Sequence, residues 1–239
     1  MPGTTITLDE ALDLTRTGDI WLFRGHSMAD RAIRVTTNSP VNHVGMSVVL
    51  DDLPPLMWHA ELGRSLPDLW SGTHQRGVQL HDLRAAVLVW ARKYGQQAWL
   101  RQLDQPVTPE MEDAVLRTIA RLDGTPFPSS ARMVSRWLRG RVPALGVREG
   151  LSTLRQTRGR RWSLPGRGGG CGGRGVYLET AYCAEVIAVT YEAMGLLPTG
   201  RRSSWYDAGR FWSGDELPLA AGARLSGEIA VEIPGASRR

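Results

Sequence analysis

The segment that begins at Cys183 places the strongest constraint on the fold. Residues 183–194 carry apolar side chains at spacings near 3.6 residues, which is typical of a helix that buries one face. Gly195 can cap the end of this helix, and Pro198 follows it. Cys183 then lies at the helix N-terminus, where the helix dipole favours the reactive thiolate. The alternative is a structural cysteine, because a lone Cys on an apolar helix is often simply buried.

Short apolar runs bounded by turn residues predict a sheet. The runs expected to be strands are 20–23, 44–50, 56–60, 77–80, 86–90 and 229–233. The polar turn 51–55 predicts an antiparallel hairpin between two of them. Further helices are expected where Thr7 and Glu10 form a capping box, and from Thr108-Pro109 to Asp123-Gly124. Helical patterns also occur around 29–35 and 133–138. This mixture of helices and short strands predicts an α+β fold.

Positive charge is concentrated in one part of the chain. The 239 residues include 29 Lys and Arg against 24 Asp and Glu, a net charge of +5. Residues 132–174 contain eleven Arg and one acidic residue, Glu149. We expect a single domain over 1–239 with a basic Gly/Arg-rich insertion at about 132–175, because such a composition cannot build a core. The same charge would suit an anionic partner at 132–174, either nucleic acid or a membrane surface. Binding of such a partner is the alternative, non-enzymatic function.

The sequence also indicates where the protein is located. No basic segment followed by an apolar run opens the chain, and no apolar run approaches the roughly 18 residues of a membrane span. We therefore expect a cytoplasmic protein. Cys171 and Cys183 are its two cysteines, too few for a disulfide framework, although one bond between them is allowed. The oligomeric state is not defined by the sequence.

Two histidines lie where they could activate Cys183. A nucleophilic thiol needs a base, and the base needs a third group that holds its ring. His43 begins one strand of the expected hairpin and His59 ends the other, so the two rings could be hydrogen-bonded across the strands. Cys183, His43 and His59 therefore form a candidate triad if the helix docks against the strand of His43. His43, His59 and Glu61 or Cys183 would also suit zinc, but no short-spaced zinc motif is present, so no metal or cofactor is expected.

Four motifs carry a resemblance to a known family. They are Gly18-Asp19-Ile20-Trp21-Leu22-Phe23-Arg24-Gly25, Asn42-His43-Val44-Gly45-Met46, Trp58-His59-Ala60 and Tyr182-Cys183-Ala184-Glu185-Val186. In this order they resemble the motifs of circularly permuted NlpC-type papain-like cysteine hydrolases, the YiiX/YaeF-like branch, which is related in fold to the lecithin retinol acyltransferase group. In that branch the strands precede the cysteine helix, as they do here. The resemblance covers about residues 15–62 and 176–198.

The resemblance implies a permuted papain-like fold, with a small antiparallel sheet or half-barrel packed against helices. It also implies a thiol hydrolase or acyltransferase that acts on an amide, isopeptide or lipid-like acyl bond of a peptide, lipid or other substrate. Cys183 would form the thioester, His43 would be the general base, and His59 the third residue, with Glu61 as the fallback. The backbone N–H of Cys183 would contribute to an oxyanion hole.

The candidate substrate contacts are Trp21, Arg24, Ser27 and Tyr182, of which the first three are expected on a loop at the rim of the site. The chain also departs from the family pattern, because Ala184 stands where a Ser often follows the cysteine. Glu185 matches an acidic position of the branch, but a glutamate in the first turn of a helix is also favoured by the helix dipole alone.

Overall fold

The structure is a computed structural model that describes residues 4–26, 38–61, 65–126, 183–214 and 217–236. Several sequence predictions lie outside these residues: the helical patterns around 29–35 and 133–138, the basic segment 132–174, Cys171, Ser27 and Tyr182. Within the described part of the chain, no helix has the length and apolar character that a bilayer crossing requires.

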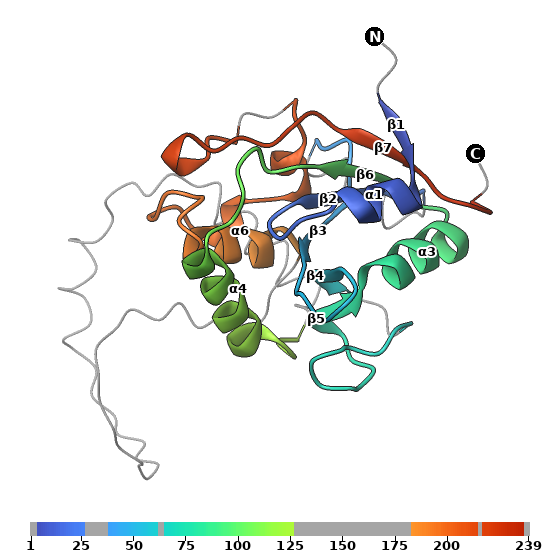
Figure 1. The fold of residues 1–239 in the computed structure, drawn as a ribbon, viewed down its shortest axis with the longest axis horizontal. Helices are drawn as coiled ribbons and strands as arrows, with labels where there is room; N and C mark the ends of the chain where they lie inside the picture. Colours follow the sequence, from blue (N-terminus) through green and yellow to red (C-terminus); the bar gives the residue numbers. More distant parts are fainter. Residues whose placement is uncertain (1–3, 27–37, 62–64, 127–182, 215–216, 237–239) are drawn as a thin grey trace, which may run out of the picture.

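A seven-stranded mixed sheet organises the described residues (Figure 1). Its strands are β1 (Thr5–Thr7), β2 (Ile20–Arg24), β3 (His43–Val48), β4 (Leu56–Glu61), β5 (Gly77–Asp82), β6 (Gln97–Arg101) and β7 (Ile229–Glu232). Their order in the sheet is β1-β7-β6-β2-β3-β4-β5. The β1–β7 pair is parallel and the other neighbours are antiparallel. The expected α+β class and the expected β3–β4 hairpin are therefore confirmed.

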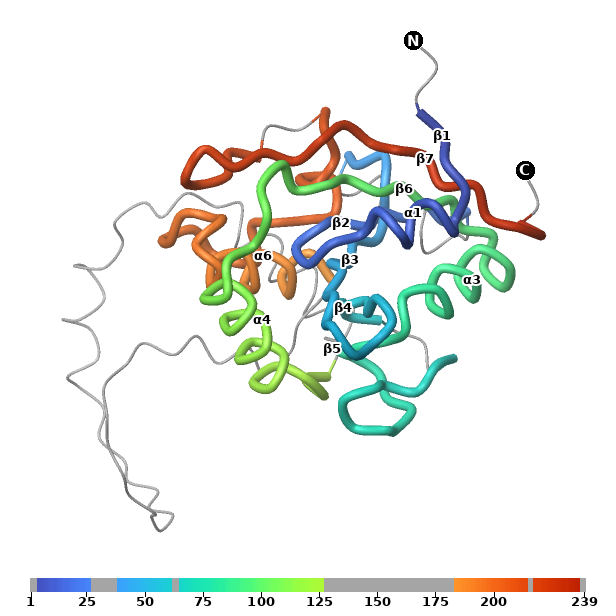
Figure 2. Tube along the Cα trace, viewed as in Figure 1, coloured from blue at the N-terminus to red at the C-terminus, as the bar shows by residue number. Residues whose placement is uncertain are grey.

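Helices cover both faces of this sheet (Figures 1 and 2). On one face, α1 (Leu8–Leu14) and α3 (Leu83–Tyr94) pack with Trp21, Phe23 and Met57. On the other, α4 (Pro109–Leu122) and α6 (Cys183–Ala193) pack with strand residues such as Leu22 and Trp58. Three short 3-10 helices, η1 (Ser203–Trp205), η2 (Ala208–Phe211) and η3 (Ala220–Gly222), follow α6. Because successive side chains of a strand point to opposite faces, neighbouring residues contribute to different cores.

The capping signals in the sequence are found at the expected helix ends. The Thr7 hydroxyl accepts a hydrogen bond from Glu10 N, and the Glu10 carboxylate accepts one from Thr7 N at 2.8 Å, which completes the capping box. Thr108 caps α4 by accepting from Met111 N. These local interactions satisfy backbone groups that the first helical turn leaves without partners.

The prediction of a strand over 86–90 is wrong, because these residues lie inside α3. Asp82 caps this helix by accepting from Ala85 N, and Gly95 ends it in the left-handed conformation with φ of 64°. Its buried residues recur at helical rather than strand spacing: Leu83, Ala86, Val87, Trp90 and Ala91. The apolar run was predicted to be a strand because Asp82 and Gly95 were not recognised as helix caps. Strand β6, which follows α3, was not predicted.

Helix α6 is confirmed in position, but it is buried on nearly every side. Eight of its eleven residues are buried, whereas Ala193 is exposed, so the expected single buried face is wrong. Two hydrogen bonds tie it to the sheet side: Trp58 Nε1 donates to Thr190 Oγ1 at 3.0 Å, and the Tyr191 hydroxyl donates to Gly18 O at 2.5 Å. The helix that carries Cys183 is therefore held firmly between the sheet and α4.

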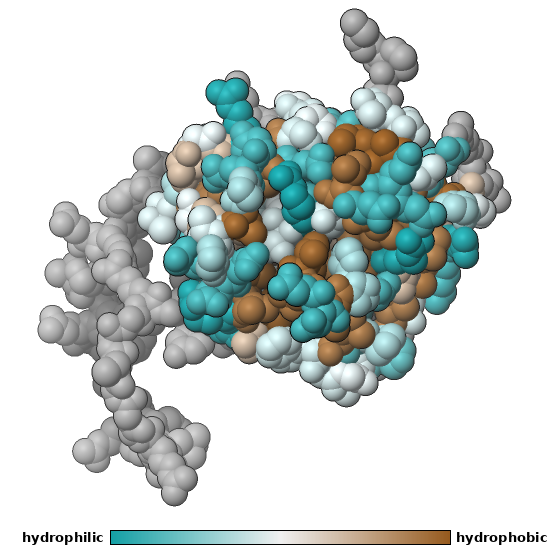
Figure 3. All heavy atoms as spheres, in the orientation of Figure 1, coloured by the Kyte–Doolittle hydropathy of each residue, from teal (hydrophilic) through white to brown (hydrophobic). Residues whose placement is uncertain are grey.

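Apolar residues also reach the surface (Figure 3). Among the large exposed ones are Leu53, Leu69 and Trp70, which line an apolar pocket of about 380 Å³. Val48 and Leu56 line the same pocket, and they lie at the opposite ends of β3 and β4 from His43 and His59. This pocket is therefore separate from the histidines.

Candidate active site

The hairpin of β3 and β4 brings His43 and His59 together. The His43 Nε2 atom lies 3.1 Å from His59 Nδ1, within hydrogen-bond distance. The hairpin pairs Met46 with Trp58, and this register continues to Gly45 opposite His59. His43 therefore reaches His59 diagonally across the hairpin, on the face that α3 covers.

Strand β5 extends this pair into a chain of buried polar side chains. His59 Nε2 lies 3.1 Å from His81 Nδ1, and His81 Nε2 lies 3.1 Å from Gln79 Oε1. Trp90 of α3 packs against the chain, with its ring 4.9 Å from that of His43 and 4.8 Å from that of His59. We call these four residues, His43, His59, His81 and Gln79, the imidazole chain. His81 was one of five histidines considered as a base from the sequence but was not placed in the site, and Gln79 was not considered, although their spacing of two places both on one face of a strand.

The Gln79 amide gives the imidazole chain a direction. With its Oε1 atom facing His81, Gln79 accepts a hydrogen bond in the tautomer of His81 that carries its proton on Nε2. A neutral imidazole has one N–H, so His81 Nδ1 accepts from His59 Nε2, and His59 Nδ1 accepts from His43 Nε2. This arrangement leaves the lone pair of His43 Nδ1 available to take a proton.

Burial keeps the three imidazoles neutral. Loss of solvation lowers the pKa of His43 to about 3 and that of His81 to about 4, from the ordinary value of 6.5. The pKa of His59 is well below the ordinary value, first because of burial and then because His81 and His43 are close. His43 is therefore an unprotonated base at neutral pH.

Cys183 is the first residue of α6 and is 7% exposed. Its side chain belongs to the core on the α4 and α6 face, and it lies beside the backbone N–H of Val44. Helix α6 therefore docks against the strand that carries His43, but on the face of β3 opposite to the His43 side chain. His43 itself points to the α3 face, and the described residues include no hydrogen bond between its ring and the thiol.

The thiol of Cys183 is protonated in this environment. Burial raises its pKa from 9.0 to about 11, although the backbone N–H groups of Val44 and Ala184 lower it. The N–H groups at the helix N-terminus favour the thiolate as expected, but desolvation outweighs them and the pKa of Cys183 stays above its ordinary value. The resting site holds a neutral thiol and a neutral imidazole.

The expected substrate contacts have mixed outcomes. Trp21 lies in β2 with an exposure of 0%, so its expected place on a loop at the rim is wrong. Arg24 ends β2, where its Nε donates to Pro40 O at 2.6 Å and its guanidinium lies 5.0 Å from the centre of the Trp99 ring. Ser27 and Tyr182 lie outside the described residues.

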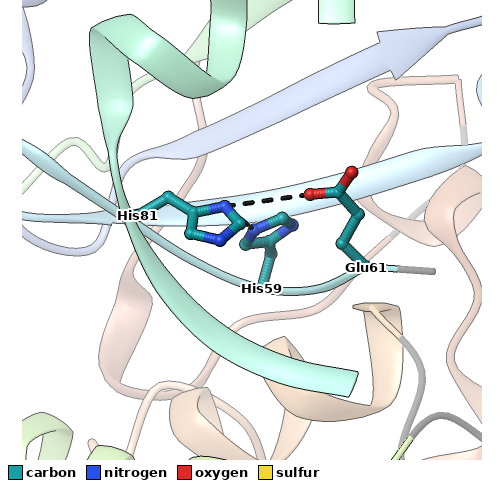
Figure 4. Close-up of side chains that lie close together, drawn as sticks. All are labelled: His59, Glu61 and His81. Atoms are coloured by element: carbon teal, nitrogen blue, oxygen red, sulfur yellow. Dashed lines mark hydrogen bonds and ion pairs between the residues drawn. The ribbon is translucent and has the colours of Figure 1, made fainter. Parts of the chain in front are cut away.

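Two glutamates weighed from the sequence have contacts with other residues. Glu61, the fallback third residue, has its Oε2 atom 3.8 Å from His81 Nδ1 (Figure 4). Glu185 is completely buried and accepts a hydrogen bond from Ser203 Oγ at 2.8 Å. Glu185 therefore links α6 to η1, which is more than the helix dipole alone would require.

Comparison with known proteins adds a distant likeness to a solved structure. No protein-family model and no curated protein matches the chain. Among solved structures, the chain is similar to the metalloprotein yiiX from Escherichia coli O157:H7, with 16% sequence identity and a TM-score of 0.43 over 93% of this chain and 91% of that one. A likeness at this level assigns no activity or ligand, so the function is argued from the site alone.

Proposed function

We propose that the protein is a thiol hydrolase or acyltransferase with a permuted papain-like arrangement, in which Cys183 is the nucleophile and His43 the general base. The observation that carries this proposal is the imidazole chain, which ends at an available lone pair on His43 Nδ1. The Cys183 thiol lies beside the backbone of the next residue, Val44. A base held in one tautomer, on the same strand as the backbone that contacts a thiol at a helix N-terminus, suits nucleophilic catalysis.

The proposed reaction requires the Cys183 side chain and the His43 ring to turn toward each other around the start of β3, because they lie on opposite faces of this strand. Contacts between nucleophile and base are commonly loose in structures without substrate and tighten when substrate binds. The thiol proton passes to His43 Nδ1 as Sγ attacks the acyl carbon. The proton on His43 then goes to the leaving amine or alcohol, and the acyl group stays on Cys183 as a thioester.

The second half of the reaction releases the acyl group. His43 takes a proton from water or from an acceptor alcohol or amine, whose oxygen or nitrogen attacks the thioester, and the thiol of Cys183 is restored. The backbone N–H groups at the start of α6 stabilise the negative charge on the acyl oxygen in both halves. His59 holds the His43 ring by accepting from its Nε2. The substrate class is an amide, isopeptide or lipid-like ester of a peptide, lipid or other acyl compound.

The alternative is a non-enzymatic module that binds an anionic partner through residues 132–174. It is supported by the composition of a segment outside the described residues. The buried imidazole chain is unnecessary for such binding, because surface arginines alone would supply it. The geometry therefore favours the enzyme.

Acylation by an activated ester tests this proposal. Incubation with p-nitrophenyl acetate should place one acetyl group on Cys183, seen by intact mass and located by peptide mapping. Cys183→Ala should abolish this acetylation, and His43→Ala should slow it about 100-fold or more, because general-base catalysis contributes about 10²–10⁴.

Two controls and one contrary outcome complete this experiment. Cys171→Ala, which removes the other cysteine, and His74→Ala, which removes an exposed histidine, should both acetylate as the wild type does. Labelling of Cys183 that is unchanged by His43→Ala would contradict the proposed base.

A further inference from the structure

We propose that His59, Glu61 and His81 form a binding site for a divalent transition metal, of which zinc is the probe. Each residue offers one ligand atom, and these atoms lie within 4.8 Å of one another. His59 and Glu61 are two residues apart on β4, and His81 comes from the neighbouring strand β5 (Figure 4). A pair of adjacent strands thus brings together two imidazoles and one carboxylate.

The spacing of the donor atoms is close to that of a metal site. His59 Nε2 and His81 Nδ1 are 3.1 Å apart, and Glu61 Oε2 is 3.8 Å from His81 Nδ1. Ligand atoms at about 2.0–2.1 Å from a tetrahedral zinc ion are about 3.3–3.4 Å apart. Small side-chain shifts would therefore bring all three donors to bonding distance. Two imidazoles and a carboxylate suit zinc, and also iron, cobalt and nickel in the divalent state.

The second nitrogen of each histidine already has the partner that a metal ligand needs. Metal-binding histidines usually donate their other N–H to an acceptor that holds the ring in place. His81 Nε2 lies 3.1 Å from Gln79 Oε1, and His59 Nδ1 lies 3.1 Å from His43 Nε2. Gln79 and His43 would therefore orient the two imidazole ligands.

The carboxylate gives an independent reason for a cation. Glu61 Oε2 is buried without a hydrogen-bond partner among the described residues, although Trp90 donates a hydrogen bond to the carboxylate, and the Glu61 side chain is 11% exposed. This oxygen faces His81 Nδ1, which is itself an acceptor when Gln79 holds the His81 proton on Nε2. Two acceptors that face each other in a buried site gain most from a cation between them.

A bound metal would reverse the direction of the imidazole chain. With the metal on His59 Nε2, the neutral His59 ring carries its proton on Nδ1 and donates to His43 Nε2. His43 then carries its own proton on Nδ1, which is the atom that would accept the thiol proton. Metal binding would therefore block the general base, and this consequence, unlike the binding itself, rests on the proposed function.

Metal titration of the full chain tests the site. Protein freed of metal by a chelator and dialysed should bind one equivalent of Zn²⁺, measured by competition with a chromogenic chelator, and Co²⁺ should give the absorption of a nitrogen- and oxygen-ligated ion. Glu61→Gln, which keeps the size of the side chain, and His81→Ala should each weaken Zn²⁺ binding at least about 10-fold. Thermal unfolding checks that both variants remain folded.

Matched variants separate this site from other sources of metal binding. His26→Ala removes an exposed histidine and Cys183→Ala removes the thiol, and both should bind Zn²⁺ as the wild type does. Wild-type affinity in Glu61→Gln, or loss of binding in Cys183→Ala, would overturn the site. The absence of any stoichiometric binding to the wild type would overturn it as well.

The effect on the thiol is measured separately. One equivalent of Zn²⁺ should slow acetylation of Cys183 at least about 10-fold in the wild type and leave Glu61→Gln unchanged. Metal binding without slower acetylation would overturn the coupling to His43. If Cys183 is never acetylated but Zn²⁺ binds at Glu61, the proposed function fails and the metal site stands.

Discussion

Gln79 is the residue that gives the imidazole chain its direction, because its amide oxygen accepts from His81 Nε2 at 3.1 Å. Replacement by Leu removes this acceptor and leaves a buried N–H without a partner. We predict that Gln79→Leu lowers the free energy of unfolding by about 1–3 kcal/mol, which denaturant titration would measure. It should also slow acetylation of Cys183 about 10-fold. Without the Gln79 acceptor, the histidine tautomers are no longer fixed, and His43 can carry its proton on Nδ1, the atom that must accept the thiol proton.

A matched variant distinguishes this positioning role from a loss of stability. Gln96→Leu changes a half-buried glutamine outside the imidazole chain and should leave the acetylation rate as in the wild type. If Gln79→Leu lost stability but acetylated Cys183 at the wild-type rate, Gln79 would be a structural residue only.

Part of the site follows from the sequence at the scale of single residues. The hairpin pattern was sufficient to bring His43 and His59 together, because strand alternation and a short turn determine which side chains share a face. His81 was missed because its contact depends on the register of β5 against β4, a pairing across a longer loop. The raised pKa of Cys183 was not predicted because burial depends on every element packed around α6.

At the scale of elements, the close packing of the β3–β4 hairpin depends on Gly45. A Cβ atom at this position would collide with Met57 Sδ and lie 3.5 Å from the Cβ of His59. We predict that Gly45→Ala lowers the free energy of unfolding by about 1–3 kcal/mol, because overpacking moves the neighbouring strand. Denaturant titration would measure this loss.

The Gly45→Ala substitution should also affect the contact between His43 and His59. Displacement of β4 would lengthen the contact between His43 and His59, so Gly45→Ala should acetylate Cys183 more slowly than the wild type. Gly227→Ala is the control, since a Cβ there meets no atom within 4 Å and should change neither quantity. A free energy of unfolding in Gly45→Ala equal to that of the wild type would contradict this prediction, because it would mean that the hairpin accommodates the added Cβ atom.

The two apolar runs at 86–90 and 183–194 show how far a local sequence pattern distinguishes a helix from a strand. Both are helices, but only the second was recognised, because its C-terminal Gly195 was read as a cap whereas Asp82 and Gly95 were not. A short apolar run is compatible with a buried strand or a buried helix, and the caps decide between them.

At the scale of the whole molecule, Asp19 links the start of β2 to segments distant in the sequence. Its Oδ1 accepts from Leu103 N and its Oδ2 from Arg16 N, each at 2.8 Å. Burial raises the pKa of Asp19 from 3.8 to about 6, although these hydrogen bonds lower it. The folded protein therefore favours the protonated carboxyl more than the unfolded chain does.

The sign of the pH effect follows from this raised pKa. The contribution of Asp19 to stability is fully present below about pH 3.8 and is lost as the pH rises through about 6. We predict that, from pH 4 to 7, the wild type loses up to about 3 kcal/mol relative to Asp19→Asn, whose amide does not titrate. Denaturant titrations of both proteins at several pH values measure this difference, since all other titrating groups are shared. A constant difference would contradict the raised pKa.

The sequence predicted the α+β class of the whole molecule but not the arrangement of strands in its sheet. The segment near the N-terminus and the closing strand pair as β1 and β7, with Thr5 beside Ala230, and β6 joins β7 to β2. Such pairings join residues far apart in the sequence, and local periodicity carries no information about them. The α+β class followed from the mixture of elements, whereas the strand order did not.

The pH dependence of Cys183 acetylation by p-nitrophenyl acetate tests the central claim most directly. Without a base, the rate follows the thiolate fraction, which rises about tenfold per pH unit below a pKa of about 11. We predict this steep rise in His43→Ala, and a faster, much flatter profile between pH 6 and 8 in the wild type, because His43 takes the thiol proton. Identical steep profiles in the two proteins would show that Cys183 reacts without His43 and would contradict the account.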